Sequence, residues 1–154
     1  MAKKDLKYFM RERKDEIVTV PAPESFKDEE GNVVNLEIRV LSQAEIQRIN
    51  DNYRKRSVAT DKKGQPYIAN GEVVFKTEKD NAKATRHIIV EALQYPDLKS
   101  KELMDYYGAT DITDMPMLVF RNADEYLTVQ RAVLQALGII EAPEDSELVE
   151  DAKN

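Results

Sequence analysis

The clearest pattern in the chain is an alternation of apolar and polar side chains after residue 33. Apolar residues stand at every second position from 34 to 40, with polar residues between them. Because successive side chains of a strand point to opposite faces, this pattern predicts a β-strand with one buried face. Gly31 and Asn32 supply a turn before it, so residues 25–28 are the expected partner strand. Residues 17–20 predict another brief strand, stopped by Pro21.

Beyond residue 41 the apolar positions recur at helical spacing. Ser42 and Glu45 have the spacing of a capping box, which predicts a helix over about residues 43–56. A second helix is predicted from a cap at Thr77 to a stop at Pro96. Between these two helices the turn-rich chain predicts either a short hairpin or a long flexible loop.

The hairpin prediction depends on Asn70 and Gly71, which lie between two short apolar runs and tolerate the positive φ of a type I′ turn.

Further along, a short helix is predicted after Ser100, ended by Gly108. The last predicted helix covers residues 123–137. Its apolar residues span an arc of roughly 220°, more than a surface helix needs. We interpret it as the central helix of the core; the alternative is a face shared with a second protein.

The first residues form a short amphipathic pattern. Leu6, Phe9 and Met10 recur at spacings of three and four, with Tyr8 on the flank of the same predicted helix. A helix this short is marginal alone. It either packs on its own domain or contacts a partner, so Leu6, Tyr8, Phe9 and Met10 are candidate partner-binding residues.

Taken together, these elements predict an α+β fold that is mostly α-helical: a small helical domain with one or two short N-terminal β-hairpins. We expect three regions along the chain. Residues 1–25 are an N-terminal helix and strand segment, residues 26–140 are the main domain, and residues 141–154 are an acidic disordered tail.

Composition narrows the function. The chain has 154 residues, of which 42% are hydrophobic and 34% charged, as in one globular domain. It has no cysteine and one histidine, which argues against disulfides and against thiolate or histidine-rich metal sites. No run approaches the ~20 apolar residues of a membrane span, and the charged start does not resemble a signal peptide. The expected location is the cytoplasm.

Charge disfavours general nucleic-acid binding, because the net charge is -6 and the last residues are acidic. The exception is a basic cluster within residues 54–63. Such a cluster usually marks a solvated loop. The alternative function that it allows is a small nucleic-acid-binding regulator.

The side chains that could carry chemistry do not form a recognisable constellation. His87 is expected at the edge of an apolar helical stripe. Asp105, Asp111 and Asp114 lack the spacing of a calcium loop and are interpreted as turn and capping residues, with a carboxylate hydrolase as the alternative. We therefore predict no enzyme activity and no catalytic, cofactor-binding or metal-binding residue. A last group, Tyr95, Tyr106 and Tyr107, suits core packing or a partner surface.

Two segments carry a resemblance to a known family. They are FKDEEGNVVNLEIRVLSQAEI at 26–46 and EALQYPDLKSKELMDYYGATD at 91–111. Both are similar to segments of the XkdN-like tail assembly chaperones of phages and prophages, and similarity extends over about 26–138. Around 57–75 the chain is longer than the family pattern.

The resemblance implies a non-enzymatic phage tail assembly chaperone. Such a protein binds the tape measure protein during virion morphogenesis, with tail tube subunits as a further candidate partner. It needs no cofactor, works in the bacterial host cytoplasm and is absent from the mature virion. A homo-oligomer is compatible with this role, and residues 26–140 would be the chaperone domain.

Overall fold

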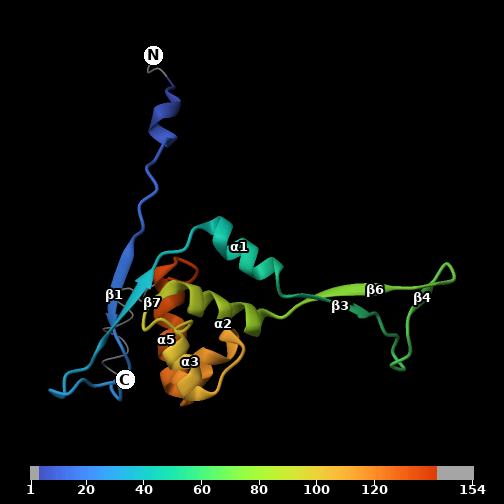
Figure 1. Cartoon of the computed structure of the whole chain (residues 1–154). Helices are drawn as coiled ribbons and strands as arrows, with labels where there is room; N and C mark the ends of the chain where they lie inside the picture. Colours follow the sequence, from blue (N-terminus) through green and yellow to red (C-terminus); the bar gives the residue numbers. More distant parts are fainter. Residues whose placement is uncertain (1–3, 142–154) are drawn as a thin grey trace, which may run out of the picture.

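The structure is a computed structural model that describes residues 4–141. Figure 1 shows a body of packed helices beside a small sheet, from which two segments project in different directions. One is the N-terminal segment that precedes β1. The other is a long hairpin between α1 and α2, which we call the β-arm (residues 54–79). The acidic segment expected to be disordered lies, apart from Glu141, outside the described residues.

The body contains a three-stranded antiparallel sheet in the order β1-β2-β7. Its strands are β1 (Ile17–Pro21), β2 (Asn35–Arg39) and β7 (Leu93–Tyr95). Leu36 and Ile38 are buried, while Asn35 and Glu37 are exposed, which confirms the alternation seen in the sequence.

The neighbours of β2 differ from the sequence prediction. β2 pairs along its whole length with β1, from Ile17 opposite Arg39 to Pro21 opposite Asn35. The turn predicted near Gly31 does bring residues 26 and 34 together, through a 2.9 Å bond from the Val34 amide to the Phe26 carbonyl. That segment forms an isolated bridge rather than a strand.

Helix α1 (Gln43–Asp51) begins as predicted. The Ser42 hydroxyl accepts a hydrogen bond from the Glu45 amide, and the Glu45 carboxylate accepts one from the Ser42 amide, so the capping box is confirmed. The helix ends five residues before the predicted end at residue 56. The reason is pairing, because Arg54–Val58 form strand β3 against a segment distant in sequence.

Helix α2 (Asn81–Ala92) lies at the centre of the body. Its cap is Asp80, whose carboxylate accepts a bond from the Lys83 amide, and the predicted cap Thr77 lies instead in strand β6. The helix ends before Pro96 as expected, but the last residues before the proline form β7. Five of its residues are buried: Ala84, Ile88, Ile89, Val90 and Ala92.

The remaining helices complete one face of the core. They are α3 (Lys101–Tyr107), the short 3-10 helix η2 (Ile112–Asp114), α4 (Met115–Val119) and α5 (Ala123–Ala136). Gly108 ends α3 at positive φ, as predicted, and Gly138 follows the end of α5, also at positive φ. α5 is not the central helix: only Val129 and Val133 are fully buried on it, and Leu127 is exposed.

The β-arm contains four strands. β3 (Arg54–Val58) pairs with β6 (Phe75–Lys79), and beyond them β4 (Ile68–Ala69) pairs with β5 (Glu72–Val73). Asn70 and Gly71 join β4 to β5 with φ of 54° and 78°, which confirms the predicted hairpin rather than a loop. The hairpin is much longer than predicted, because β3 and β6 extend it back to the body.

These strands correct the predicted fold class. The structure is a mixed α+β fold with 39% helix and 22% strand, and not a mostly helical domain. The strands lie in three small sheets, of which only one belongs to the body. The predicted helices extend too far at three places: after residue 51, before residue 81 and just before Pro96. At each place a short strand forms instead, through pairing with a distant segment.

Candidate partner-binding surfaces

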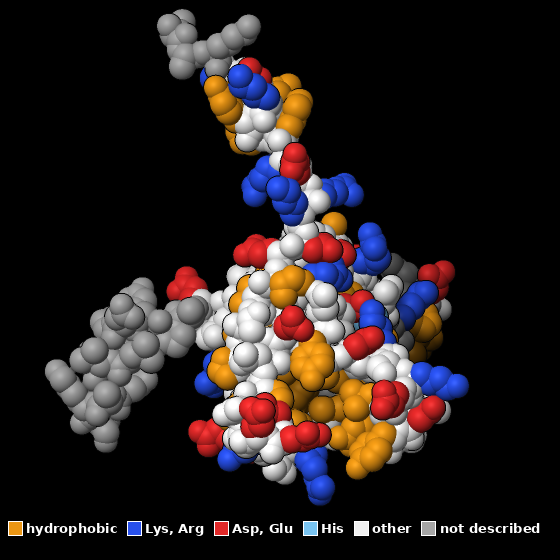
Figure 2. All heavy atoms as spheres, turned by 60° about the vertical axis from the view of Figure 1, so that its left-hand side comes forward, with side chains coloured by type: hydrophobic (Ala, Val, Ile, Leu, Met, Phe, Trp, Pro, Cys, Tyr) orange, Lys and Arg blue, Asp and Glu red, His pale blue; other side chains and the backbone are white. Residues whose placement is uncertain are grey.

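The N-terminal segment exposes the predicted partner-binding residues. Residues Leu6–Phe9 form a 3-10 helix, η1, whose cap Asp5 accepts a bond from the Lys7 amide at 2.9 Å. The side chains of Leu6, Tyr8, Phe9 and Met10 are 72–84% exposed. Figure 2 shows hydrophobic side chains around this segment where it stands clear of the body. The alternative that the segment packs on its own domain is therefore not what the structure shows.

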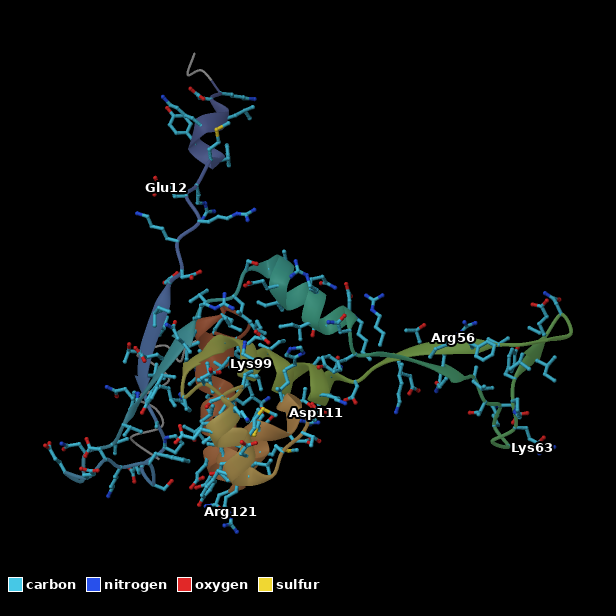
Figure 3. The ribbon with its side chains drawn as sticks, in the orientation of Figure 1. Glu12, Arg56, Lys63, Lys99, Asp111 and Arg121 are labelled. Carbon is cyan, nitrogen blue, oxygen red and sulfur yellow. The ribbon has the colours of Figure 1, made fainter. Side chains whose placement is uncertain are left out.

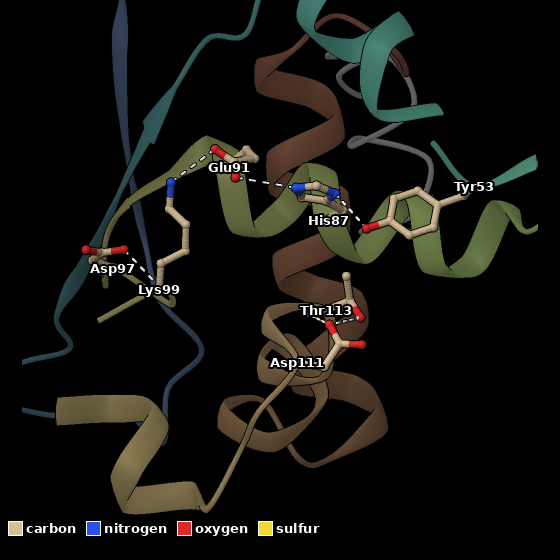
Figure 4. Close-up of polar contacts among 7 residues, drawn as sticks. All are labelled: Tyr53, His87, Glu91, Asp97, Lys99, Asp111 and Thr113. Atoms are coloured by element: carbon tan, nitrogen blue, oxygen red, sulfur yellow. Dashed lines mark hydrogen bonds and ion pairs between the residues drawn. The ribbon is translucent and has the colours of Figure 1, made fainter. Parts of the chain in front are cut away.

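A chain of polar contacts fixes the root of the β-arm to α2 (Figure 4). The Tyr53 hydroxyl lies 2.7 Å from His87 Nδ1, and the other ring nitrogen lies 3.4 Å from Glu91. Lys99 Nζ extends this chain with a 3.1 Å contact to Glu91. Partial burial raises the pKa of Tyr53. His87 is half-buried on the helix edge, as predicted, and its contacts position the chain that enters the β-arm.

The aspartates around Gly108 do not converge. The Asp111 carboxylate caps η2, accepting bonds from the Thr113 amide at 2.9 Å and the Thr113 hydroxyl at 2.7 Å. These bonds lower the pKa of Asp111. Asp105 is exposed on α3. Within residues 4–141, no group of three or more His, Cys, Asp or Glu side chains is arranged to hold a metal ion. The turn and capping interpretation is confirmed for Asp111.

The tyrosine group contributes to an open groove between β7 and α3. Tyr95 and Tyr106 are exposed, Tyr107 is half-buried, and the rings of Tyr106 and Tyr107 meet edge to face at 4.9 Å. The groove has a volume of about 850 Å³, with Pro96 and Leu103 in its lining. In Figure 2, hydrophobic side chains gather low on the body with acidic side chains around them. These tyrosines therefore belong to a surface and not only to the core.

The basic cluster of residues 54–63 lies on the β-arm and not in a loop of the body. Figure 3 shows Arg56 on the paired strands of the β-arm and Lys63 near a turn farther out, both away from the helices. Residues 54–79 contain seven lysines and arginines against three acidic residues, a net charge of +4 in a chain of -6. The pairing of β3 with β6 adds Lys76 and Lys79 to this cluster.

The two long strands of the β-arm carry little sequence signal. Residues 54–58 (RKRSV) and 75–79 (FKTEK) are mostly polar and show no alternation of apolar and polar side chains. That alternation is the pattern that predicts a half-buried strand. Only the tip of the β-arm, with Asn70 and Gly71 between apolar residues, is predictable from local sequence.

Comparisons with known proteins agree with the resemblance in the sequence. The family model of the phage XkdN-like tail assembly chaperone protein matches residues 6–153. Two Bacillus subtilis (strain 168) proteins are similar over 97% of this chain. One is the uncharacterized protein YqbN, 28% identical over 93% of its length; the other is the phage-like element PBSX protein XkdN, 26% identical over 94%.

A solved structure has the same fold. The crystal structure of YqbN matches with a TM-score of 0.66 at 24% identity, covering 89% of this chain and 98% of the other. Over the part of the chain that the structure describes, no helix is long and apolar enough to cross a membrane. Because the family model covers nearly the whole chain, this protein belongs to the XkdN-like phage tail assembly chaperone family.

Proposed function

We propose that this protein is a non-enzymatic chaperone that binds the tape measure protein during tail assembly, and that Leu6, Tyr8, Phe9 and Met10 contact this client. The observation that carries the proposal is the exposure of these four side chains on a segment that projects from the body. Apolar side chains so exposed favour a partner that can bury them. Tail tube subunits are a second candidate client of the same surface.

The chemistry of this segment suits a helical client. Its apolar side chains would insert between apolar side chains of an amphipathic helix, and such a contact requires neither nucleotide nor metal. Lys7 and Arg11 flank the apolar residues and would remain at the polar rim of the interface. The proposed place of action is the host cytoplasm, before the virion is complete.

Co-expression with the tape measure protein of the same phage tests this function. The client should remain in solution and co-purify with the chain, in the absence of added nucleotide and in a chelator. Because the centre of the interface is apolar, the complex should survive about 1 M salt, where the Debye length is about 3 Å. If no tail protein of the same gene cluster co-purifies, the chaperone assignment is wrong.

Replacing Leu6, Phe9 and Met10 together with serine tests the contact itself. We expect loss of the client with an unchanged melting temperature, because these side chains are exposed in the free protein. The matched control is the pair Lys7→Ser and Arg11→Ser, which changes the same segment but spares its apolar side chains. Retained client binding by the triple variant would show that the contact lies elsewhere on the chain.

A further inference from the structure

The two faces of the β-arm differ in charge. In an antiparallel pair, residues directly opposite share a face, and the next pair lies on the other side. One face carries Arg54 opposite Lys79, Arg56 opposite Thr77, and Val58 opposite Phe75. We call this the basic face, because β3 and β6 place three cations and no acidic residue on it. The other face carries Lys55 opposite Glu78 and Ser57 opposite Lys76, and Lys76 pairs with Glu78 at 2.8 Å.

The basic face is built at a cost that local contacts offset only in part. Like charges directly opposite each other destabilise a ribbon, as with Arg54 and Lys79. Asp51 of α1 pairs with Arg54 at 2.8 Å, but within residues 4–141 no ion pair involves Arg56 or Lys79. A carboxylate bound across this face would remove the repulsion.

Apolar side chains lie beside these cations. The Arg56 guanidinium lies 4.2 Å from the ring centre of Phe75, in cation–π geometry. Phe75 and Val58 are 49% and 39% exposed at the outer end of the same face. The surface therefore suits an extended segment that carries carboxylates together with one or two apolar residues.

We propose that the basic face binds the acidic C-terminal segment of the same chain, residues 142–154. That segment has five carboxylates and one lysine, and Leu148 and Val149 are its larger apolar residues. Its carboxylates complement Arg54, Arg56 and Lys79. The contact is separate from the client contact proposed for the N-terminal segment.

The segment is long enough to reach the β-arm. Helices of 12 and 14 residues, the lengths of α2 and α5, measure about 18 and 21 Å. The two helices are in contact, and the β-arm joins the body where α2 begins. In Figure 1, α5 ends beside α2, so its end lies no farther from the root of the β-arm than the length of α2 plus an interaxial distance of about 10 Å, or about 28 Å. Residues 142–151, which hold the five carboxylates, span about 34 Å when extended. Covalent linkage raises the effective concentration to about the millimolar range, so weak charge pairs suffice within one chain.

Zero-length carbodiimide cross-linking of the full-length protein tests this contact. The reagent joins carboxylates to lysine amines, and Lys79 is the one lysine that β3 and β6 place on the basic face. We expect cross-links from Lys79 to the carboxylates of residues 144–151, in the monomer and several-fold above those from Lys76. They should fall to background in about 1 M salt, where charges are screened beyond about 3 Å.

Two substitutions of equal charge serve as a matched pair. Arg56→Glu, on the basic face, should abolish the Lys79 cross-links. Lys55→Glu, the next residue on the opposite face, should leave them intact. The melting temperature of both variants verifies that the body stays folded, since neither side chain belongs to the core. Equal loss in both variants, or cross-links of equal yield from Lys79 and Lys76, would overturn the proposal.

The other possible occupants give different results. Cross-links confined to dimers would identify the acidic segment of a second copy and overturn the contact within one chain. A labelled single-stranded oligonucleotide tests the nucleic-acid alternative, since cations beside an aromatic ring also suit bases and phosphates. The test uses the wild type, Arg56→Glu, and a variant with the five carboxylates neutralised (E144Q, D145N, E147Q, E150Q, D151N). If the oligonucleotide binds the wild type and the neutralised variant equally but does not bind Arg56→Glu, the surface is a nucleic-acid site and the proposal fails.

Discussion

Leu36 shows how single side chains hold the body together. It is 2% exposed in the middle strand of the sheet, and the core that it joins includes Ile38 and Ile89. A charge at this position has no partner and cannot leave the core without unpairing β2. We expect Leu36→Asp to lower the free energy of unfolding by at least about 3 kcal/mol, as for an uncompensated buried charge. Chemical denaturation followed by circular dichroism measures this loss.

The adjacent residue provides the control. Glu37 lies on the outward face of β2, opposite Thr19. Glu37→Lys should change the free energy of unfolding by no more than about 0.5 kcal/mol, as is usual for exposed positions. Equal stability of the two variants would contradict the burial of this face.

Asp111 links the stability of a capped turn to pH. Hydrogen bonds from Thr113 lower the pKa of Asp111, so its carboxylate stabilises the folded state wherever the side chain is also ionised in the unfolded chain. That contribution is complete above the unfolded pKa of about 3.9 and is lost as the pH falls through it toward the lower folded pKa.

We therefore expect Asp111→Ala to cost about 1 kcal/mol of unfolding free energy at pH 7, the usual effect of losing a cap. The difference from wild type should shrink as the pH is lowered from 5 to 3. Urea unfolding at each pH measures it. The ion pair with Lys83, 3.6 Å away, adds little because both side chains are well exposed. The control is Asp105→Ala, an exposed position on α3, which should change the free energy of unfolding at pH 7 by no more than about 0.5 kcal/mol.

At the scale of elements, the sequence predicts where helices and turns begin and end better than it predicts which strands pair. Ser42 with Glu45, Gly108 and the Asn70-Gly71 turn each satisfy backbone groups within a few residues, so the sequence contains the whole interaction. β3, β6 and β7 are different, since their backbone partners lie far away in the chain. No local pattern states where such a partner is, and for this reason the fold was predicted as mostly helical.

The same distinction separates the candidate surfaces. Leu6, Phe9 and Met10 could be predicted as candidate partner residues because their spacing and the shortness of their segment are local properties. Whether they packed on the body depended on the tertiary structure. The basic face of the β-arm required the register of β3 against β6, which puts Arg54 beside Lys79 across 25 residues of sequence. Sequence analysis found the basic cluster but not its one-sided arrangement.

For the whole molecule, the hydrophobic core and the proposed binding surfaces lie in different regions. The core lies among the body sheet, α1, α2, α4 and α5, and its side chains come from between residues 22 and 133. The N-terminal segment and the β-arm project from this body, and over residues 4–141 neither contributes a residue to the buried cluster. Tyr53, just before the β-arm, is half-buried and packs against the cluster. A projecting segment can bind and release a partner without unfolding the core that carries it.

This separation predicts the effect of truncating the chain after Glu141. The removed residues are polar except for a few small or isolated apolar side chains, so they cannot contribute much apolar burial to the body. The contact proposed for them is with the β-arm, whose strands lie outside the core, and it consists of screened surface charges worth about 0–1 kcal/mol per pair. The truncated protein should therefore unfold with a free energy within about 1 kcal/mol of the full chain, measured by urea denaturation, and should still bind the tape measure protein through its N-terminal segment. The full-length variant with its five C-terminal carboxylates neutralised is the control for charge alone. A larger loss of stability on truncation would mean that residues beyond Glu141 pack on the body, and the proposed occupant of the basic face would then have to be abandoned.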